Sequence, residues 1–255
     1  MNALKAAAAL LAASLGAGAA PPQVAPDAPV ARPTGASIPA NLLRLSLRFA
    51  RRPAGPVLAR VGLRRGTGDP IAQPFLDQEL WSPDGRTLTI LMHPGRVKTG
   101  LIANERLGRA LEPGETVILT VDGRPVRRWR VEAPDVSPPT PATWRVNTPR
   151  AFSNDPLEVS LDGPVDALDV DLIAVRAPDG RRVPGTATLE AGETRWRFHP
   201  RGPWRTGRYV VVGAPELEDP AGNRPGQDFE HAPGASAPMT DGPAFEPIAT
   251  RGGRR

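Results

Sequence analysis

The chain contains no cysteine among its 255 residues. It therefore has no disulfide bond, no thiolate nucleophile or metal ligand, and no thiol for a lipid anchor. Each folded domain must be stabilised by the apolar surface that it buries. A domain of roughly 90–100 residues buries on the order of 60–65% of the surface of its unfolded chain, which is sufficient but leaves a small margin.

Histidine is scarce, and catalytic signatures are missing. The three histidines lack His-x-His or His-x3-His spacing, so the sequence predicts no metal site. His93 and His199 each precede a proline, and we assign both a structural role. The chain has no Gly-x-Ser-x-Gly elbow, phosphate-binding loop or dinucleotide-binding fingerprint. We therefore expect no catalytic residues, no cofactor and no enzyme activity.

Long apolar runs are confined to the N-terminus. Lys5 precedes the run 6–15, and small residues follow at 17–19, which is typical of a secretory signal peptide over residues 1–20. Residues 21–37 are rich in proline and alanine and are predicted to form an extended linker. We therefore expect export to the periplasm, the cell surface or the medium, and no transmembrane segment in the mature chain.

The rest of the chain shows the period-2 alternation of β-strands in two blocks. Apolar and polar residues alternate over 43–49 and again over 157–162, and Asp122-Gly123 is typical of a hairpin turn. Short strands and turns recur without helical periodicity, which favours a β-sandwich in each block. The sequence predicts an all-β fold of two tandem immunoglobulin-like β-sandwiches with disordered termini.

The domain boundaries follow from composition. We place the first sandwich at 38–133, a proline-rich linker at 134–141, the second sandwich at 142–230 and a disordered tail at 231–255.

Three landmarks recur in the same order in the two blocks, which indicates an internal repeat. The matched pairs are Leu43–Leu47 with Leu157–Leu161, Ile90–Pro94 with Trp196–Pro200, and Pro113–Val117 with Thr206–Val210.

At these landmarks the second block resembles the bacterial immunoglobulin-like domains of the SbsA-like type. The resemblance is carried by Val159–Asp166 (VSLDGPVD), by Gly207-Arg208-Tyr209 and by the run Asp219–Asn223 (DPAGN). The first block departs from this pattern, and its assignment depends on the repeat. The resemblance implies exported or envelope-associated modules that present surfaces or space other domains, without shared catalytic residues.

Candidate binding residues come from one loop and two tryptophans. The loop between His93 and Gly114 is longer than its counterpart in the second block, and long loops on a β scaffold often bind ligands. Trp81 and Trp204 lie near predicted loops and could stack on sugar rings. The alternatives are a packed connection for the loop and a core position for each tryptophan. The candidate residues are Arg96, Lys98, Asn104, Arg106, Trp81 and Trp204.

We interpret the chain as an exported, non-enzymatic interaction or structural module of the bacterial cell envelope that contacts a protein or an envelope polysaccharide. Two alternatives remain: a carbohydrate-binding module, and a small hydrolase built on acids such as Glu216 and Asp219. The acidic cluster of Glu216, Glu218 and Asp219 could also bind calcium or form an ordinary acidic loop. The arginines at 44–65 could bind an anionic polymer, but nucleic acid is disfavoured because aromatic residues are not interleaved with them. The partner's identity and the oligomeric state stay open.

Overall fold

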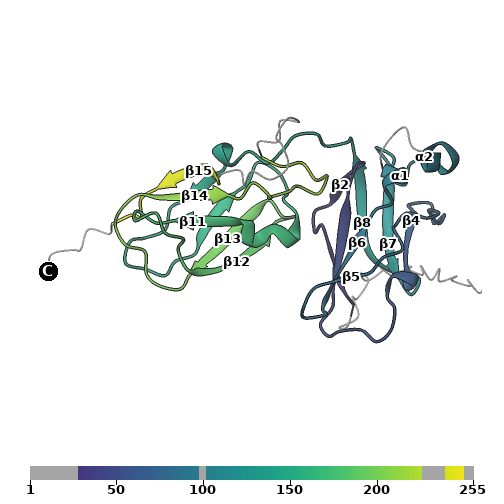
Figure 1. Cartoon of the computed structure of the whole chain (residues 1–255), viewed down its shortest axis with the longest axis horizontal. Helices are drawn as coiled ribbons and strands as arrows, with labels where there is room; N and C mark the ends of the chain where they lie inside the picture. The colour runs from purple at the N-terminus through teal and green to yellow at the C-terminus, as the bar shows by residue number, and fades with distance from the viewer. Residues whose placement is uncertain (1–27, 98–101, 226–238, 250–255) are drawn as a thin grey trace, which may run out of the picture.

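The computed structural model describes residues 28–97, 102–225 and 239–249. These residues form two tandem immunoglobulin-like β-sandwiches, which lie next to each other along the long axis of the molecule (Figure 1). Each sandwich packs two sheets face to face, and each has its own apolar core. The described residues contain no helix that is long and apolar enough to cross a membrane.

The first sandwich has two four-stranded sheets, in the orders β1-β3-β6-β5 and β2-β8-β7-β4. Strand β2 runs parallel to β8, whereas the other pairs are antiparallel. The elements are β1 (Val30–Arg32), β2 (Ser37–Pro39), β3 (Arg44–Arg48), a 3-10 helix (Leu58–Arg60), β4 (Val61–Arg65), β5 (Leu80–Trp81), β6 (Thr87–Leu91), α1 (Pro94–Val97), α2 (Ile102–Leu107), β7 (Thr116–Val121) and β8 (Arg124–Glu132).

The second sandwich packs a four-stranded sheet, β12-β13-β10-β9, on a three-stranded sheet, β11-β14-β15. Its elements are a 3-10 helix (Pro141–Thr143), β9 (Arg145–Asn147), β10 (Leu157–Ser160), a 3-10 helix (Ala167–Leu172), β11 (Ile173–Arg176), β12 (Gly185–Glu190), β13 (Arg195–Pro200), β14 (Tyr209–Gly213) and β15 (Thr240–Phe245).

The alternating segments form the strands at the centres of the sheets. In β3, Leu45 and Leu47 are buried and pair with β6, and in β10, Leu157 and Val159 are buried and pair with β13. The three landmark pairs of the predicted repeat fall on β3 and β10, β6 and β13, and β7 and β14, which hold equivalent places in the two sheet orders. The hairpin at Asp122-Gly123 is confirmed, because both residues have the positive φ that its turn requires (51° and 72°).

The predicted linker 21–37 is wrong over its last residues, which already belong to the first sandwich. Val30–Arg32 forms β1 and pairs with β3, and Ser37 begins β2 beside β8. Each strand has only three residues, which is too short for alternation to stand out in a segment rich in proline. The predicted signal peptide, residues 1–20, and the first part of the predicted linker, residues 21–27, lie outside the described residues.

The predicted tail 231–255 is wrong at Thr240–Phe245, which forms β15 at the edge of the second sandwich. The strand contains Gly242 and Pro243, residues that disfavour central strands but are tolerated at an edge. Phe245 completes the core, with its ring centroid 5.6 Å from that of Trp204 and 5.4 Å from that of Tyr209. The second sandwich therefore extends beyond residue 230.

The candidate binding loop between His93 and Gly114 is partly helical. The segment after His93 forms the short helices α1 and α2, and the backbone N–H of Gly95 donates to His93 Nδ1. Val97, Ala110 and Leu111 are buried in the first core. The described part of this segment is thus a packed connection, as in the alternative considered above.

Candidate functional site

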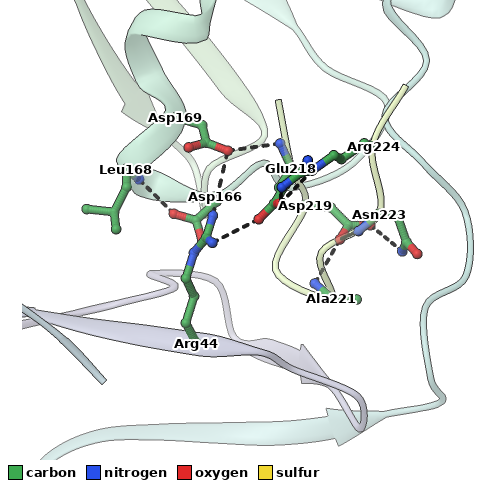
Figure 2. Close-up of polar contacts among 9 residues, drawn as sticks. All are labelled: Arg44, Asp166, Leu168, Asp169, Glu218, Asp219, Ala221, Asn223 and Arg224. Atoms are coloured by element: carbon green, nitrogen blue, oxygen red, sulfur yellow. Dashed lines mark hydrogen bonds and ion pairs between the residues drawn. The ribbon is translucent and has the colours of Figure 1, made fainter. Parts of the chain in front are cut away.

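The junction between the two sandwiches holds a cluster of charged residues centred on Arg44 (Figure 2). Arg44 opens β3 and extends from the first sandwich toward carboxylates of the second. Its Nε lies 2.6 Å from Asp166 Oδ2, an Nη lies 2.8 Å from Glu218 Oε2, and the other Nη lies 3.8 Å from Asp169 Oδ2. One guanidinium thus contacts three carboxylates of the other domain, a charge-assisted arrangement that fixes orientation as well as distance.

Backbone N–H groups of the second sandwich donate hydrogen bonds to two of these carboxylates. Asp166 caps the 3-10 helix Ala167–Leu172 by accepting from Leu168 N at 2.8 Å, and its N–H donates to the carbonyl of Glu218 at 2.7 Å. The carboxylate of Asp169 accepts from Glu218 N at 2.9 Å. Glu218 also pairs with Arg224. Contacts within the second sandwich therefore orient the carboxylates that accept from Arg44.

Burial perturbs the protonation of this cluster. Burial acts to lower the pKa of Arg44, but Asp166 first, and then Glu218 and Asp169, raise it above its usual range. Burial raises the pKa of Asp169 to about 6, and the negative charges of Asp166 and Glu218 raise it as well. The hydrogen bond from the backbone N–H of Glu218 and the positive charge of Arg44 act to lower it. Asp169 therefore titrates close to neutral pH.

The run Asp219–Asn223 forms a turn that packs against the first sandwich. The Asp219 carboxylate accepts from the N–H of Ala221 at 2.8 Å, the N–H of Asn223 at 2.9 Å and the Asn223 side chain at 2.7 Å. Burial raises the pKa of Asp219, and the hydrogen bonds from Asn223 oppose this. The turn's Pro220 carbonyl accepts from Leu43 N at 3.0 Å. Gly222 has φ of +85°, and a Cβ at this position would overlap the side chain of Leu43. The turn is thus shaped to lie against the start of β3.

A second turn of the second domain packs on the segment between β1 and β2. Glu193 is 1% exposed, and its carboxylate accepts from Arg32 at 2.7 Å and from the N–H and hydroxyl of Thr34 at 2.7 and 2.8 Å. Ala191, Gly192 and Glu193 all have positive φ (52°, 72° and 63°), a conformation that costs energy for residues other than glycine. The contacts with Arg32 and Thr34 stabilise this strained turn.

The linker is bound from both sides. Asp135 exchanges two hydrogen bonds with Asn41 of the first sandwich, at 2.7 and 2.9 Å, and its carbonyl also accepts from Asn223 of the second at 3.1 Å. Thr140 N donates to Asp162 at 2.8 Å. The spacer is therefore fixed by side chains as well as by its prolines.

Two of the predicted binding residues are buried. Arg96 is 2% exposed, and its guanidinium donates to the carbonyls of Leu107 and Gly108, so that it ties α1 to the end of α2. Burial, together with the charge of Arg65, lowers the pKa of Arg96. Trp204 is 1% exposed in the second core and donates to the carbonyl of Asp155 at 2.8 Å. Neither side chain is open to a ligand, so their assignment to a binding surface is corrected to a structural role.

Of the other four predicted residues, the structure describes the side chains of Trp81 and Arg106. Trp81 is partly buried, packs on Phe49 at a centroid distance of 5.9 Å and donates to Glu79 at 2.8 Å. Arg106 is exposed at the end of α2. Lys98 lies outside the described residues, and for Asn104 the structure places the backbone in α2 alone. Their role in binding stays a prediction.

The acids of the hydrolase alternative have other partners. Asp219 accepts its hydrogen bonds within the turn, Glu218 pairs with arginines from both domains, and Glu216 is exposed. Among the described residues, no group of three or more His, Asp or Glu side chains is arranged to hold a metal ion.

Sequence reasoning missed the junction. Arg44 belongs to the arginine-rich stretch 44–65, in which no partner is marked, and no motif of the sequence marks Glu193. The available signal was the resemblance itself, since Asp166 and Asp219–Asn223 carry it and both contact the first sandwich.

No family model matches the chain, and no curated protein matches it. Similar solved structures include murine CEACAM1b, with 12% identity over 88% of this chain and 99% of that one at a TM-score of 0.23. They also include domains 5–6 of the S-layer protein SbsC, with 11% identity over 87% and 99% at a TM-score of 0.25. The Escherichia coli adhesin FdeC matches with 13% identity over 71% and 55% at a TM-score of 0.22. Such low scores carry no argument about function, and the fold assignment here follows from the strand order.

Proposed function

We propose that the protein is an exported, non-enzymatic module of the cell envelope that holds two immunoglobulin-like sandwiches in one fixed orientation and presents its surface to a protein or an envelope polymer. The observation that supports this most strongly is the junction. It combines the ion pairs of Arg44 and Arg32 with a backbone hydrogen bond from Leu43 to Pro220, and both domains bind the linker residue Asp135.

Tandem domains that meet through few contacts move relative to each other by default. Here, by contrast, the contacts come from three separate segments of the second domain, around Asp166, Glu193 and Asp219–Asn223. Three separate attachment points oppose hinge and twist motions of one sandwich relative to the other. A fixed orientation suits a spacer or a presenting surface and is not needed by two independently binding domains.

The absence of cysteine makes the test straightforward, because introduced cysteines are the sole labelling sites. Spin labels at the exposed Ala59 and Thr188, one in each sandwich, report the interdomain distance by pulsed electron resonance. We expect a single narrow distance distribution for the parent chain and a broad one after Arg44→Glu with Glu193→Ala. Arg176→Ala, which removes an ion pair within the second sandwich, should leave the distribution narrow.

A broad distribution in the parent chain would refute the proposed fixed orientation. So would an unchanged distribution in the double variant, because the contacts described above would then not set the geometry.

A further inference from the structure

At the end of β8 away from the linker, the first sandwich has a groove of about 1110 Å³ between its two sheets. Pockets for small molecules hold roughly 300–1,000 Å³, so this volume suits a segment of a chain better than a single small ligand. Its apolar lining includes Phe49, Val121 and Val126, and its rim carries the arginines Arg51, Arg52, Arg60, Arg124, Arg127 and Arg128.

Three of these arginines have no anionic partner in the part of the chain that the structure describes. The one acid among the lining residues, Asp122, pairs with both Nε and Nη2 of Arg60 at 2.8 Å. Arg52, Arg124 and Arg128 are exposed, and their side chains make no hydrogen bond or ion pair with any described residue. Three exposed cations that line one groove leave a positive potential, which attracts an anionic partner.

The groove also runs along an open strand edge. Strand β2 pairs with β8 at Arg130–Glu132, so that among the described residues the first half of β8, from Arg124 to Arg128, has a neighbouring strand on the β7 side alone. The opposite sheet ends at β1, which pairs with β3 alone. Arg127 spans the seam between these edges, and its guanidinium donates to the carbonyls of Thr34 and Gly35. Five residues of open β8 correspond to about 17 Å of strand, enough to receive a short added strand.

We propose that this groove binds an extended acidic segment of a partner protein, which adds to the open edge of β8 with its carboxylates on Arg52, Arg124 and Arg128 and its apolar side chains on Phe49 and Val126. Across the β7–β8 pair, Arg124 lies opposite Val121 and Arg128 lies opposite Ile118, so the two arginines are on opposite faces of the sheet and would flank an added strand from both sides. An anionic polysaccharide would satisfy the charges but would leave the strand edge and the apolar floor without complementary groups. This proposal names the partner of the module described above and rests on that function.

The test uses a fluorescent peptide of alternating glutamate and valine, (Glu-Val)4, and the full chain in an anisotropy titration. We expect saturable binding that weakens as salt is raised, because the arginines are solvent-exposed. Arg124→Glu with Arg128→Glu should weaken binding at least tenfold. Arg201→Glu with Arg208→Glu, the same charge change at exposed sites of the second sandwich, should leave it within twofold.

Amide hydrogen exchange separates strand addition from charge attraction. Bound peptide should slow exchange at residues 124–128 and leave β12, the edge of the other domain, unchanged. A (Glu-Gly)4 peptide retains the charge and lacks the apolar side chains, and we expect it to bind at least fivefold more weakly. Equal binding of the two peptides would refute the role of the apolar floor.

Several results would overturn the proposal. These are absence of binding at millimolar peptide, equal binding by the Arg124/Arg128 variant, or binding of polygalacturonate without binding of the peptide. Binding that is seen only after residues 21–27 have been replaced by a Gly-Ser segment would assign the groove to the chain's own preceding residues. The spin-label distances do not involve this groove, so failure here leaves the fixed orientation standing, and the reverse also holds.

Discussion

Strand β3 separates two groups of arginines that differ in their partners. At its start, Arg44 is 24% exposed and contacts three carboxylates of the second sandwich. Beyond its end lies the groove, where Arg52, Arg124 and Arg128 are exposed and have no side-chain partner within the described ranges. The same side chain therefore stabilises a domain junction in one region and leaves charge available for a partner in the other. The role of each arginine depends on which side chains the fold places near it. The number of arginines in that stretch of sequence does not determine this role.

The largest expected effect is at the junction. Arg44→Glu places a further carboxylate beside Asp166, Asp169 and Glu218, and the loss of a partly buried pair costs about 2–4 kcal/mol. We expect urea denaturation to change from one transition to two, one for each sandwich. The matched change Arg176→Glu removes the exposed pair with Asp241 and should cost less than about 1 kcal/mol. Equal effects of the two variants would show that the partly buried ion pairs of the junction stabilise the protein no more than an exposed pair does.

Gly192→Ala tests the second contact of the junction. Gly192 has φ of +72°, and an added Cβ would lie 2.9 Å from the Cα of Gly35 in the other domain. We expect a loss of about 2–3 kcal/mol from strain and displacement together. Gly180→Ala, at φ of +83° with no atom within 4 Å of the added Cβ, carries strain alone and should cost about 1 kcal/mol. If the two variants lose the same stability by thermal denaturation, the contact between Gly192 and Gly35 does not contribute.

Asp169→Asn gives the junction a pH signature. The pKa of Asp169 is raised from 3.8 to about 6, so between these values the folded state holds a proton that the unfolded state has released. The free energy of unfolding contributed by this group therefore increases as the pH falls from 7 through 6. The shift corresponds to about 3 kcal/mol at full burial, which we reduce to about 1 kcal/mol because the group is only partly buried.

In urea denaturation we expect Asp169→Asn to be more stable than the parent chain by about 1 kcal/mol at pH 7 and to lose this advantage at pH 5. A stability difference that is the same at both pH values would show that Asp169 does not titrate in this range.

The smallest expected effect on stability is in the groove. Arg52→Gln, Arg124→Gln and Arg128→Gln remove exposed side chains without partners, so each should change the free energy of unfolding by less than about 0.5 kcal/mol. Thermal denaturation of the three variants provides the check. A loss above about 1 kcal/mol in any of them would show that the arginine has a structural role.

Alternation was sufficient to predict the central strands of both sandwiches. Leu45 and Leu47, and likewise Leu157 and Val159, lie on faces that are buried against an opposing sheet, so their period of two reports the fold directly. The Asp122-Gly123 hairpin was predictable for a local reason, namely the φ values that its turn demands. The order of landmarks predicted which strands would occupy equivalent places.

The edge strands and the junction could not be read from the sequence. In β1 and β15 the pairing comes from the neighbouring strand, and the segments themselves hold few buried side chains, such as Ala31 and Phe245. The pairs of Arg44 with Asp166 and of Arg32 with Glu193 join residues more than 120 positions apart. Such contacts depend on how the two folded domains pack against each other, and the alternation of apolar and polar residues within a segment does not determine that packing.

Residual dipolar couplings of backbone amides in a weakly aligned sample test the central claim most directly. If the junction fixes the two sandwiches, one alignment tensor will fit the couplings of residues 38–132 and 145–213 together, with the relative orientation of the structure. Two tensors of different magnitude would show that the sandwiches move independently and would contradict this account.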